Sequence, residues 1–64
     1  MKDMTTGERL RSLRGSRSQE EVAKAVRVSQ SAICAYEKDE RVPRDDVKIR
    51  IANYYKRSVA FIFF

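Results

Sequence analysis

The sequence predicts a small all-α domain built from five short helices. Apolar residues recur at intervals of three and four rather than alternating, which is the periodicity of amphipathic helices and not of strands. Serine or threonine stands in the N-cap position of four of the five segments. At 64 residues the chain is near the lower size limit for independent folding, so we expect one domain spanning residues 1–64.

The first two predicted helices have well-marked starts. The first covers about residues 6–14, where Thr5 and Glu8 have the spacing of a capping box. The second covers about residues 19–26, with Ser18 as its N-cap. Two acidic residues lie in its first turn, where the helix dipole favours negative charge. Its apolar residues share one face, which we expect to point into the core.

Three further helices complete the predicted domain. The third covers about residues 30–38, with Ser29 as its N-cap. The fourth begins at residue 44 or 45, shortly after a proline, and runs to about residue 55, with apolar residues every four positions. Ser58 then caps a short terminal helix over about residues 59–63.

The composition excludes several kinds of function. The chain has no histidine and a single cysteine, so it offers neither a structural zinc site nor an intrachain disulfide. Catalysis by serine–histidine or cysteine–histidine pairs is excluded too, and we expect no enzymatic activity, no metal and no cofactor. The longest apolar run, residues 59–64, is far shorter than the ~20 residues that span a membrane. We therefore expect no contact with the membrane, and the lone cysteine leads us to expect the reducing cytoplasm.

Charge and one motif indicate the kind of partner. Fourteen Lys and Arg residues against nine Asp and Glu give a net charge of +5, which favours a polyanion through release of its counterions. Residues 19–38 form two short amphipathic helices joined by a tight turn, with polar residues at both helix starts. Such a pair can lay its second helix in the major groove of DNA. The alternative is an ordinary helical hairpin with a packed core.

Six segments, taken together, carry a family pattern. They are GERLRSLR (7–14), SQEEVA (18–23), VSQSAICAYE (28–37), ERVP (40–43), IANYY (51–55) and SVAFIF (58–63). This set resembles the Cro/CI-type (xenobiotic-response-element, XRE) helix-turn-helix regulators of bacteria and phages over nearly the whole chain. The resemblance implies a compact five-helix, lambda-repressor-like domain. Its third helix would read the major groove of double-stranded DNA.

The resemblance also implies which residues would contact DNA. Gln30, Ser31 and Ala35 fall where the family reads bases, and Gln30 is the strongest candidate because glutamine can pair with adenine N6 and N7. Expected phosphate contacts come from two helix starts, the turn and the loop after the third helix. These candidates are Gln19, Ser29, Arg27, Lys38, Arg41 and Arg44. The alternative for each charged member is a solvated surface charge.

Two features of the resemblance concern structure rather than DNA. Arg14 and Glu37 occupy positions that in the family form a partly buried ion pair between the first and third helices. Arg27 replaces the glycine usual in the turn, and this would cost strain if its φ is positive. Otherwise the turn geometry shifts. Asp39 replaces a second glycine, and aspartate tolerates left-handed geometry better than most residues.

The aromatic end of the chain indicates a second surface. Phe61 and Phe64 are expected to be poorly covered, with Tyr54 close by, and exposed aromatic patches usually mark a partner surface. Homodimerisation there would present two third helices about one DNA turn apart. The alternatives are that the aromatics cap the small core or that the chain continues beyond them.

The function expected from these features is that of a sequence-specific transcriptional regulator. We expect a repressor of phage or mobile-element type, which acts by occupying its operator and performs no chemistry. The alternative is an antitoxin-like interaction module that neutralises a toxin and can also bind DNA.

Overall fold

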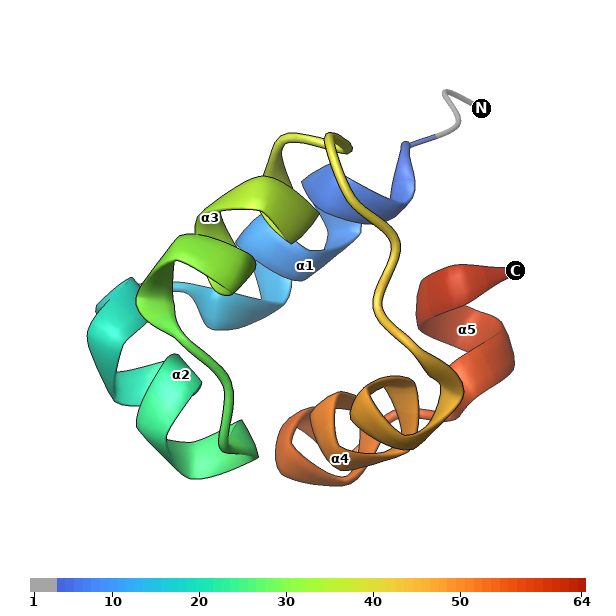
Figure 1. The fold of residues 1–64 in the computed structure, drawn as a ribbon. Coiled ribbons are helices and arrows are strands. Elements are labelled where there is room, and N and C mark those ends of the chain that lie inside the picture. The colour runs from blue at the N-terminus through green and yellow to red at the C-terminus, as the bar shows by residue number, and fades with distance from the viewer. Residues whose placement is uncertain (1–3) are drawn as a thin grey trace.

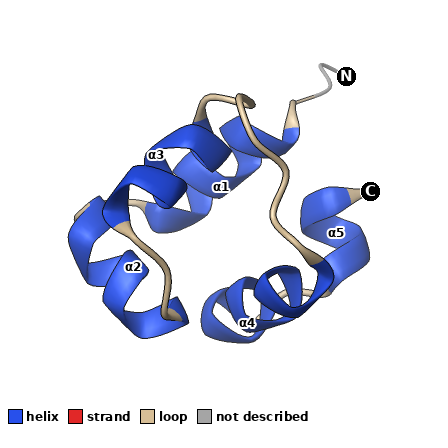
Figure 2. Ribbon diagram, viewed as in Figure 1, coloured by secondary structure: helices blue, strands red, loops and turns tan. Residues whose placement is uncertain are grey.

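Five helices account for most of residues 4–64, the part of the chain that the computed structural model describes. Figure 2 shows helices joined by loops and no strand in this range, so the all-α prediction is confirmed. The helices are α1 (Thr6–Arg14), α2 (Gln19–Val26), α3 (Gln30–Glu37), α4 (Asp45–Tyr55) and α5 (Val59–Phe63).

Short polar side chains start four of the five helices, as predicted. Thr5 forms a complete capping box with Glu8 at the start of α1. The hydroxyls of Ser18, Ser29 and Ser58 each accept a backbone N–H from the first turn of the helix that follows. These bonds satisfy donors that a helix cannot satisfy by itself, and so they fix where each helix begins.

The third helix ends one residue earlier than predicted. Lys38 leaves helical geometry at φ −96° and ψ 4°, and Asp39 adopts a left-handed φ of 60°. The Asp39 carboxylate accepts hydrogen bonds from the Thr5 hydroxyl at 2.7 Å and the Gly7 N–H at 2.9 Å. These bonds tie the end of α3 to the start of α1.

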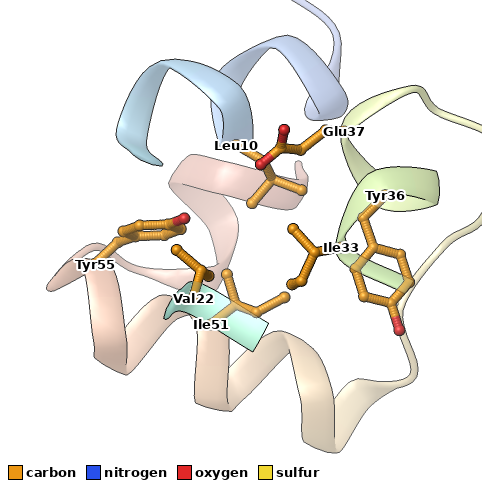
Figure 3. A pocket seen from close by; sticks show the side chains of 7 residues that line it. All are labelled: Leu10, Val22, Ile33, Tyr36, Glu37, Ile51 and Tyr55. Atoms are coloured by element: carbon orange, nitrogen blue, oxygen red, sulfur yellow. The ribbon is translucent and has the colours of Figure 1, made fainter. Parts of the chain in front are cut away.

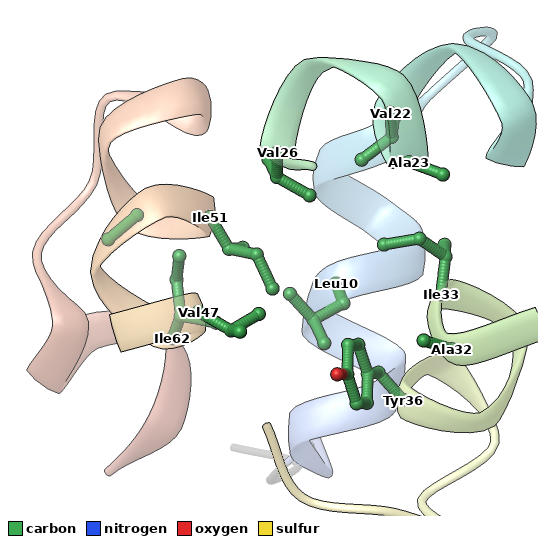
Figure 4. Close-up of a cluster of buried hydrophobic side chains, with 11 residues drawn as sticks. Leu10, Val22, Ala23, Val26, Ala32, Ile33, Tyr36, Val47, Ile51 and Ile62 are labelled. Atoms are coloured by element: carbon green, nitrogen blue, oxygen red, sulfur yellow. The ribbon is translucent and has the colours of Figure 1, made fainter. Parts of the chain in front are cut away.

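One apolar core joins all five helices. Figure 4 shows its side chains converging from helices that are far apart in sequence. The buried set is Leu10, Val22, Ala23, Val26, Ala32, Ile33, Tyr36, Val47, Ile51, Ala52 and Ile62. Because so small a domain has little apolar area to bury, each of these residues carries a large share of its stability.

The arrangement leaves one side of α3 uncovered. In Figure 1, α3 lies against α1 and α2, while α4 and α5 close the other side of the core. A long loop crosses from the end of α3 to α4. Among the described helices, none is long and apolar enough to cross a bilayer.

Candidate nucleic-acid interface

The start of α3 presents polar side chains to solvent. Ser29 caps the helix through a 3.0 Å bond from the Ala32 N–H, and Gln30 and Ser31 are exposed directly after it. Ala35 lies one turn further along and is half-buried. The three buried residues of α3 lie on its other side, against the core (Figure 4). The outward placement of Gln30 and Ser31 is the one that base reading would require.

The turn between α2 and α3 is left-handed at Arg27. Its φ is 64° and its ψ is 49°, so the turn keeps the geometry that glycine usually serves. The Val28 N–H donates to the Ala23 oxygen at 3.0 Å and closes the end of α2. Ala23 is buried, consistent with the close approach of the two helices. A side chain in this conformation costs roughly 1–2 kcal/mol.

A buried ion pair holds the other end of α3. The Glu37 carboxylate accepts from Arg14 Nε at 2.7 Å and Arg14 Nη2 at 3.0 Å, a bidentate contact. Only 5% of the Glu37 side chain and 18% of the Arg14 side chain are exposed. The hydrogen bond with Glu37 raises the pKa of the Arg14 guanidinium. The pair therefore links α1 to the end of α3 with both side chains ionised.

The Gln19 side chain is hydrogen-bonded to this ion pair. Its Nε2 donates to Glu37 Oε1 at 3.1 Å, so its side chain points into the protein. The Ser18 hydroxyl takes the Glu21 N–H, so the Gln19 and Glu20 N–H groups are the ones at the start of α2 that could face a phosphate. A phosphate contact at Gln19 thus depends mainly on its backbone.

A small apolar pocket lies behind the ion pair. Figure 3 shows Glu37 and Tyr55 facing the same space as Leu10, Val22 and Ile51. Burial, with a smaller contribution from the charge of Glu37, raises the pKa of Tyr55 to about 12. The space measures about 10 Å³, roughly that of a single water molecule, so it cannot hold a cofactor.

Exposed basic side chains follow α3 along the loop to α4. Lys38 is the C-cap residue of α3, Arg41 lies within the loop, and Arg44 is the N-cap residue of α4, where its Nε lies 4.0 Å from Asp46 Oδ1. Arg11 was missed by the sequence analysis, yet it lines the same hollow as Gln19 and Lys38. Its spacing of three residues from Arg14, which places both on one side of α1, was the available signal.

Arg27 lies apart from these basic residues. It lines a shallow hollow between α2 and α4, together with Lys24, Arg50 and Tyr54 among others. The structure therefore brings Gln19 and Lys38 together with Arg11, but it does not bring Arg27 to that hollow.

The exposed aromatic residues do not form one cluster with Tyr54. Phe61 and Phe64 are 57% and 81% exposed, as expected for a partner surface. Tyr54 instead packs with its centroid 5.1 Å from that of Tyr55 and 5.3 Å from the Arg17 guanidinium, because the end of α4 faces the loop before α2. These contacts place Tyr54 beside the loop before α2, and its part in a dimer surface stays a prediction.

Ile49 of α4 is a further exposed apolar residue beside the end of the chain. It is 52% exposed and borders a hollow with Val59 and Phe64. The Lys48 ammonium lies 5.3 Å from the Phe64 ring centroid. The surface formed by Ile49, Val59 and Phe64 is therefore apolar with a charged edge.

Comparison with known proteins supplies the context for these features. A sequence model described as a helix-turn-helix domain matches residues 6–60. The c2 repressor of P22, in complex with a synthetic operator, superposes with a TM-score of 0.92 at 25% identity, over 95% of this chain and 96% of that chain. The DNA-binding domain of the same repressor in solution gives a TM-score of 0.87 at 26% identity, over 97% and 84%. No curated protein sequence matches.

Proposed function

The chain belongs to the helix-turn-helix domain family, as a Cro/CI-type regulator, and from this premise we propose that it binds double-stranded DNA at specific sequences. Its fold and family are those of DNA-binding regulators rather than of enzymes. The whole chain, residues 1–64, acts as one DNA-binding domain and represses transcription by occupying an operator. The observation that carries the proposal is the exposed, capped start of α3, with Gln30 and Ser31 directed away from the core.

Base reading falls to three residues of α3. Gln30 offers both a donor and an acceptor and suits adenine N7 and N6. Ser31 can donate or accept with several bases and so discriminates little. Ala35 offers only apolar contact, such as to a thymine methyl group. Gln30 is thus the residue on which specificity should depend most.

Phosphate contacts position the helix without reading sequence. Lys38 directly follows α3, Arg41 lies in the loop beyond it, Arg44 is the N-cap residue of α4, and the Ser29 hydroxyl lies at the start of α3. The net charge of +5 supports this role, because each neutralised phosphate releases condensed counterions. Arg27 is the weakest candidate, since it lines a different hollow.

The apolar surface of Ile49, Val59 and Phe64, together with the exposed Phe61, supports a homodimer. A two-fold dimer would carry two copies of α3 to successive major grooves of a palindromic operator. A reducing cytoplasm suits both the lone Cys34 and a DNA-bound role.

Selection from random duplex DNA at stated salt tests the proposal directly. The selected duplex should then bind Gln30→Ala about tenfold more weakly, while a scrambled duplex binds it unchanged. Arg44→Ala should weaken both duplexes alike. Asn53→Ala, an exposed amide on α4, is the matched control and should change neither. Equal losses on both duplexes for Gln30→Ala would contradict base reading.

The same exposed aromatics support a second candidate, an antitoxin-like module that binds a protein toxin. Phe64 is 81% exposed, and an apolar patch of this kind fits either a second copy or another protein. Sedimentation of the isolated chain separates the two. A dimer that Phe64→Ser dissociates supports the regulator, whereas a monomer with no DNA selection favours the module.

A further inference from the structure

An arginine of α4 bonds to the end of the neighbouring helix α2. Arg50 Nε donates to the backbone oxygen of Val26 at 2.8 Å. Its Nη1 lies 3.3 Å from Asp46 Oδ2, one turn earlier on α4. Only 27% of the Arg50 side chain is exposed. Two contacts therefore hold this guanidinium in place.

The bonded oxygen belongs to a critical peptide unit. Val26 is the last residue of α2, and its carbonyl shares a peptide plane with the N–H of Arg27. That N–H donates to the Ala23 oxygen, so both polar atoms of the plane are held. Without Arg50, the Val26 oxygen would be one of the carbonyls that a helix end leaves without an internal partner. A cation at this end is also favoured by the helix dipole.

The next residue makes this support necessary. Arg27 sits at φ 64°, a conformation that side chains other than glycine adopt at a cost. Rotation about its N–Cα bond would relieve the strain and swing the residues that follow. Those residues are Val28 and Ser29, which lead directly into Gln30. The orientation of the Val26–Arg27 peptide therefore sets the position of the base-reading end of α3.

We propose that Arg50 is a positioning residue for DNA recognition: it fixes the Val26–Arg27 peptide and thereby holds the start of α3 in its reading position. This inference rests on the proposed function. Arg14 of α1 binds Glu37 at the far end of the same helix, and Arg50 of α4 binds the last residue of α2, just before the turn that leads into its start, so the two ends of α3 are supported by arginines from other helices.

Two variants of Arg50, one control and one rescue variant separate positioning from a simple charge effect. Arg50→Met keeps the aliphatic stem but removes every donor, and Arg50→Lys keeps the charge and one donor group. Lys24→Met is the matched control, because Lys24 lines the same hollow and is 79% exposed. Arg27→Gly removes the strain and is combined with Arg50→Met.

The first measurement needs no DNA. Amide hydrogen exchange reports the stability of the first turn of α3 through the N–H groups of Ala32 and Ile33, which bond to Ser29. Arg50→Met should speed exchange at these two amides about tenfold more than at the last turn of α3, because the loss is local. Arg50→Lys should lie between wild type and Arg50→Met. Lys24→Met should leave the pattern unchanged.

The second measurement uses the duplex selected by the wild-type chain and a scrambled duplex. The ratio of the two affinities should fall about tenfold in Arg50→Met, the loss expected when one base contact is misplaced. In the double variant Arg50→Met/Arg27→Gly, the affinity ratio should equal that of Arg27→Gly alone, because the strain that Arg50 opposes is then absent. Lys24→Met should keep the wild-type ratio.

Each other outcome has a definite meaning. Equal weakening of both duplexes by Arg50→Met would make Arg50 a phosphate contact and overturn the inference. A folded Arg50→Met chain with wild-type exchange and ratio would also overturn it. Should Arg50→Met fail to fold, Arg50→Lys decides, and a wild-type result there is again a refutation. If the wild-type chain selects no sequence, the proposed function fails, while the exchange data still test how Arg50 holds the turn.

Discussion

Removal of one partner of the Arg14–Glu37 pair should destabilise the domain far more than removal of a surface charge. Arg14→Met leaves a carboxylate that is 5% exposed with Gln19 as its remaining side-chain donor. Removing one partner of a buried pair costs about 3–5 kcal/mol because the other charge stays buried without a counter-charge. Since this site is partly exposed, we expect a loss of about 3 kcal/mol. Glu37→Gln should cost less, about 2 kcal/mol, because water reaches the more exposed arginine and the amide oxygen still accepts a bond.

These losses are large for so short a chain. A domain of 64 residues has a free energy of unfolding of about 3–10 kcal/mol, so Arg14→Met should remove a third of it or more. Urea unfolding at neutral pH, followed by far-ultraviolet circular dichroism, measures the two single variants and the double variant. The coupling free energy from this cycle should be about 1.5–3 kcal/mol.

The chain supplies its own control pair. Lys24 and Glu20 lie 3.6 Å apart on the surface of α2, with side chains 79% and 64% exposed. Their coupling should not exceed about 0.5 kcal/mol and should shrink with added salt. A coupling between Arg14 and Glu37 no larger than that of the surface pair would refute the reasoning, because burial would then add nothing.

Two further predictions concern the same region. The pKa of Tyr55 is raised to about 12, above the value near 10 of an unfolded phenol, so the unfolded state loses its proton first and stability falls as the pH rises from about 10 to about 12. Over that window the free energy of unfolding of wild type, from thermal melts, should fall by roughly 1–2 kcal/mol more than that of Tyr55→Phe. The partial exposure of the ring keeps this difference below the value of the full pKa shift. Equal losses in the two chains would contradict the prediction. Gly7→Ala should destabilise by about 1–3 kcal/mol in urea, although alanine normally favours a helix, because its Cβ would overlap the Glu37 carbonyl oxygen and lie 2.7 Å from Asp39 Oδ2. The Cβ of Gly15→Ala would meet no atom within 4 Å, but φ 59° with ψ −128° lies outside the left-handed helical region and is favourable only for glycine, so this change should cost about 1–3 kcal/mol through backbone strain alone. A Gly7→Ala chain as stable as wild type would show that the close approach can relax.

The helices could be predicted because their signals are local. Thr5, Ser18, Ser29 and Ser58 each act within three residues of themselves, so their effect can be read from spacing alone. The end of α3 was placed one residue late, at Lys38. Its true end depends on a partner far away in the sequence.

Contacts between distant segments could not be predicted in this way. The Asp39 carboxylate accepts hydrogen bonds from Thr5 and Gly7, which are more than thirty residues away in the sequence. The bond from the Thr5 hydroxyl, and to a lesser degree that from the Gly7 N–H, lowers the pKa of the Asp39 carboxyl. Arg50 bonds the carbonyl of Val26. A side chain that binds a backbone atom elsewhere leaves no pattern in the sequence, because any residue supplies the acceptor or donor. From the sequence, Asp39 is identified only as a residue that tolerates left-handed geometry, and Arg50 is not singled out.

The same distinction applies to the candidate DNA-binding surface. Helical periodicity alone places Gln30 and Ser31 opposite the buried face of α3, so their exposure follows from sequence. Their position in space does not, because an eight-residue helix is too short to be stable by itself and takes its place from its neighbours. Arg14, Glu37 and Arg50 supply that support without lying on the exposed face. Specific DNA affinity should therefore respond to changes in the scaffold behind α3 as strongly as to changes in the residues that read bases.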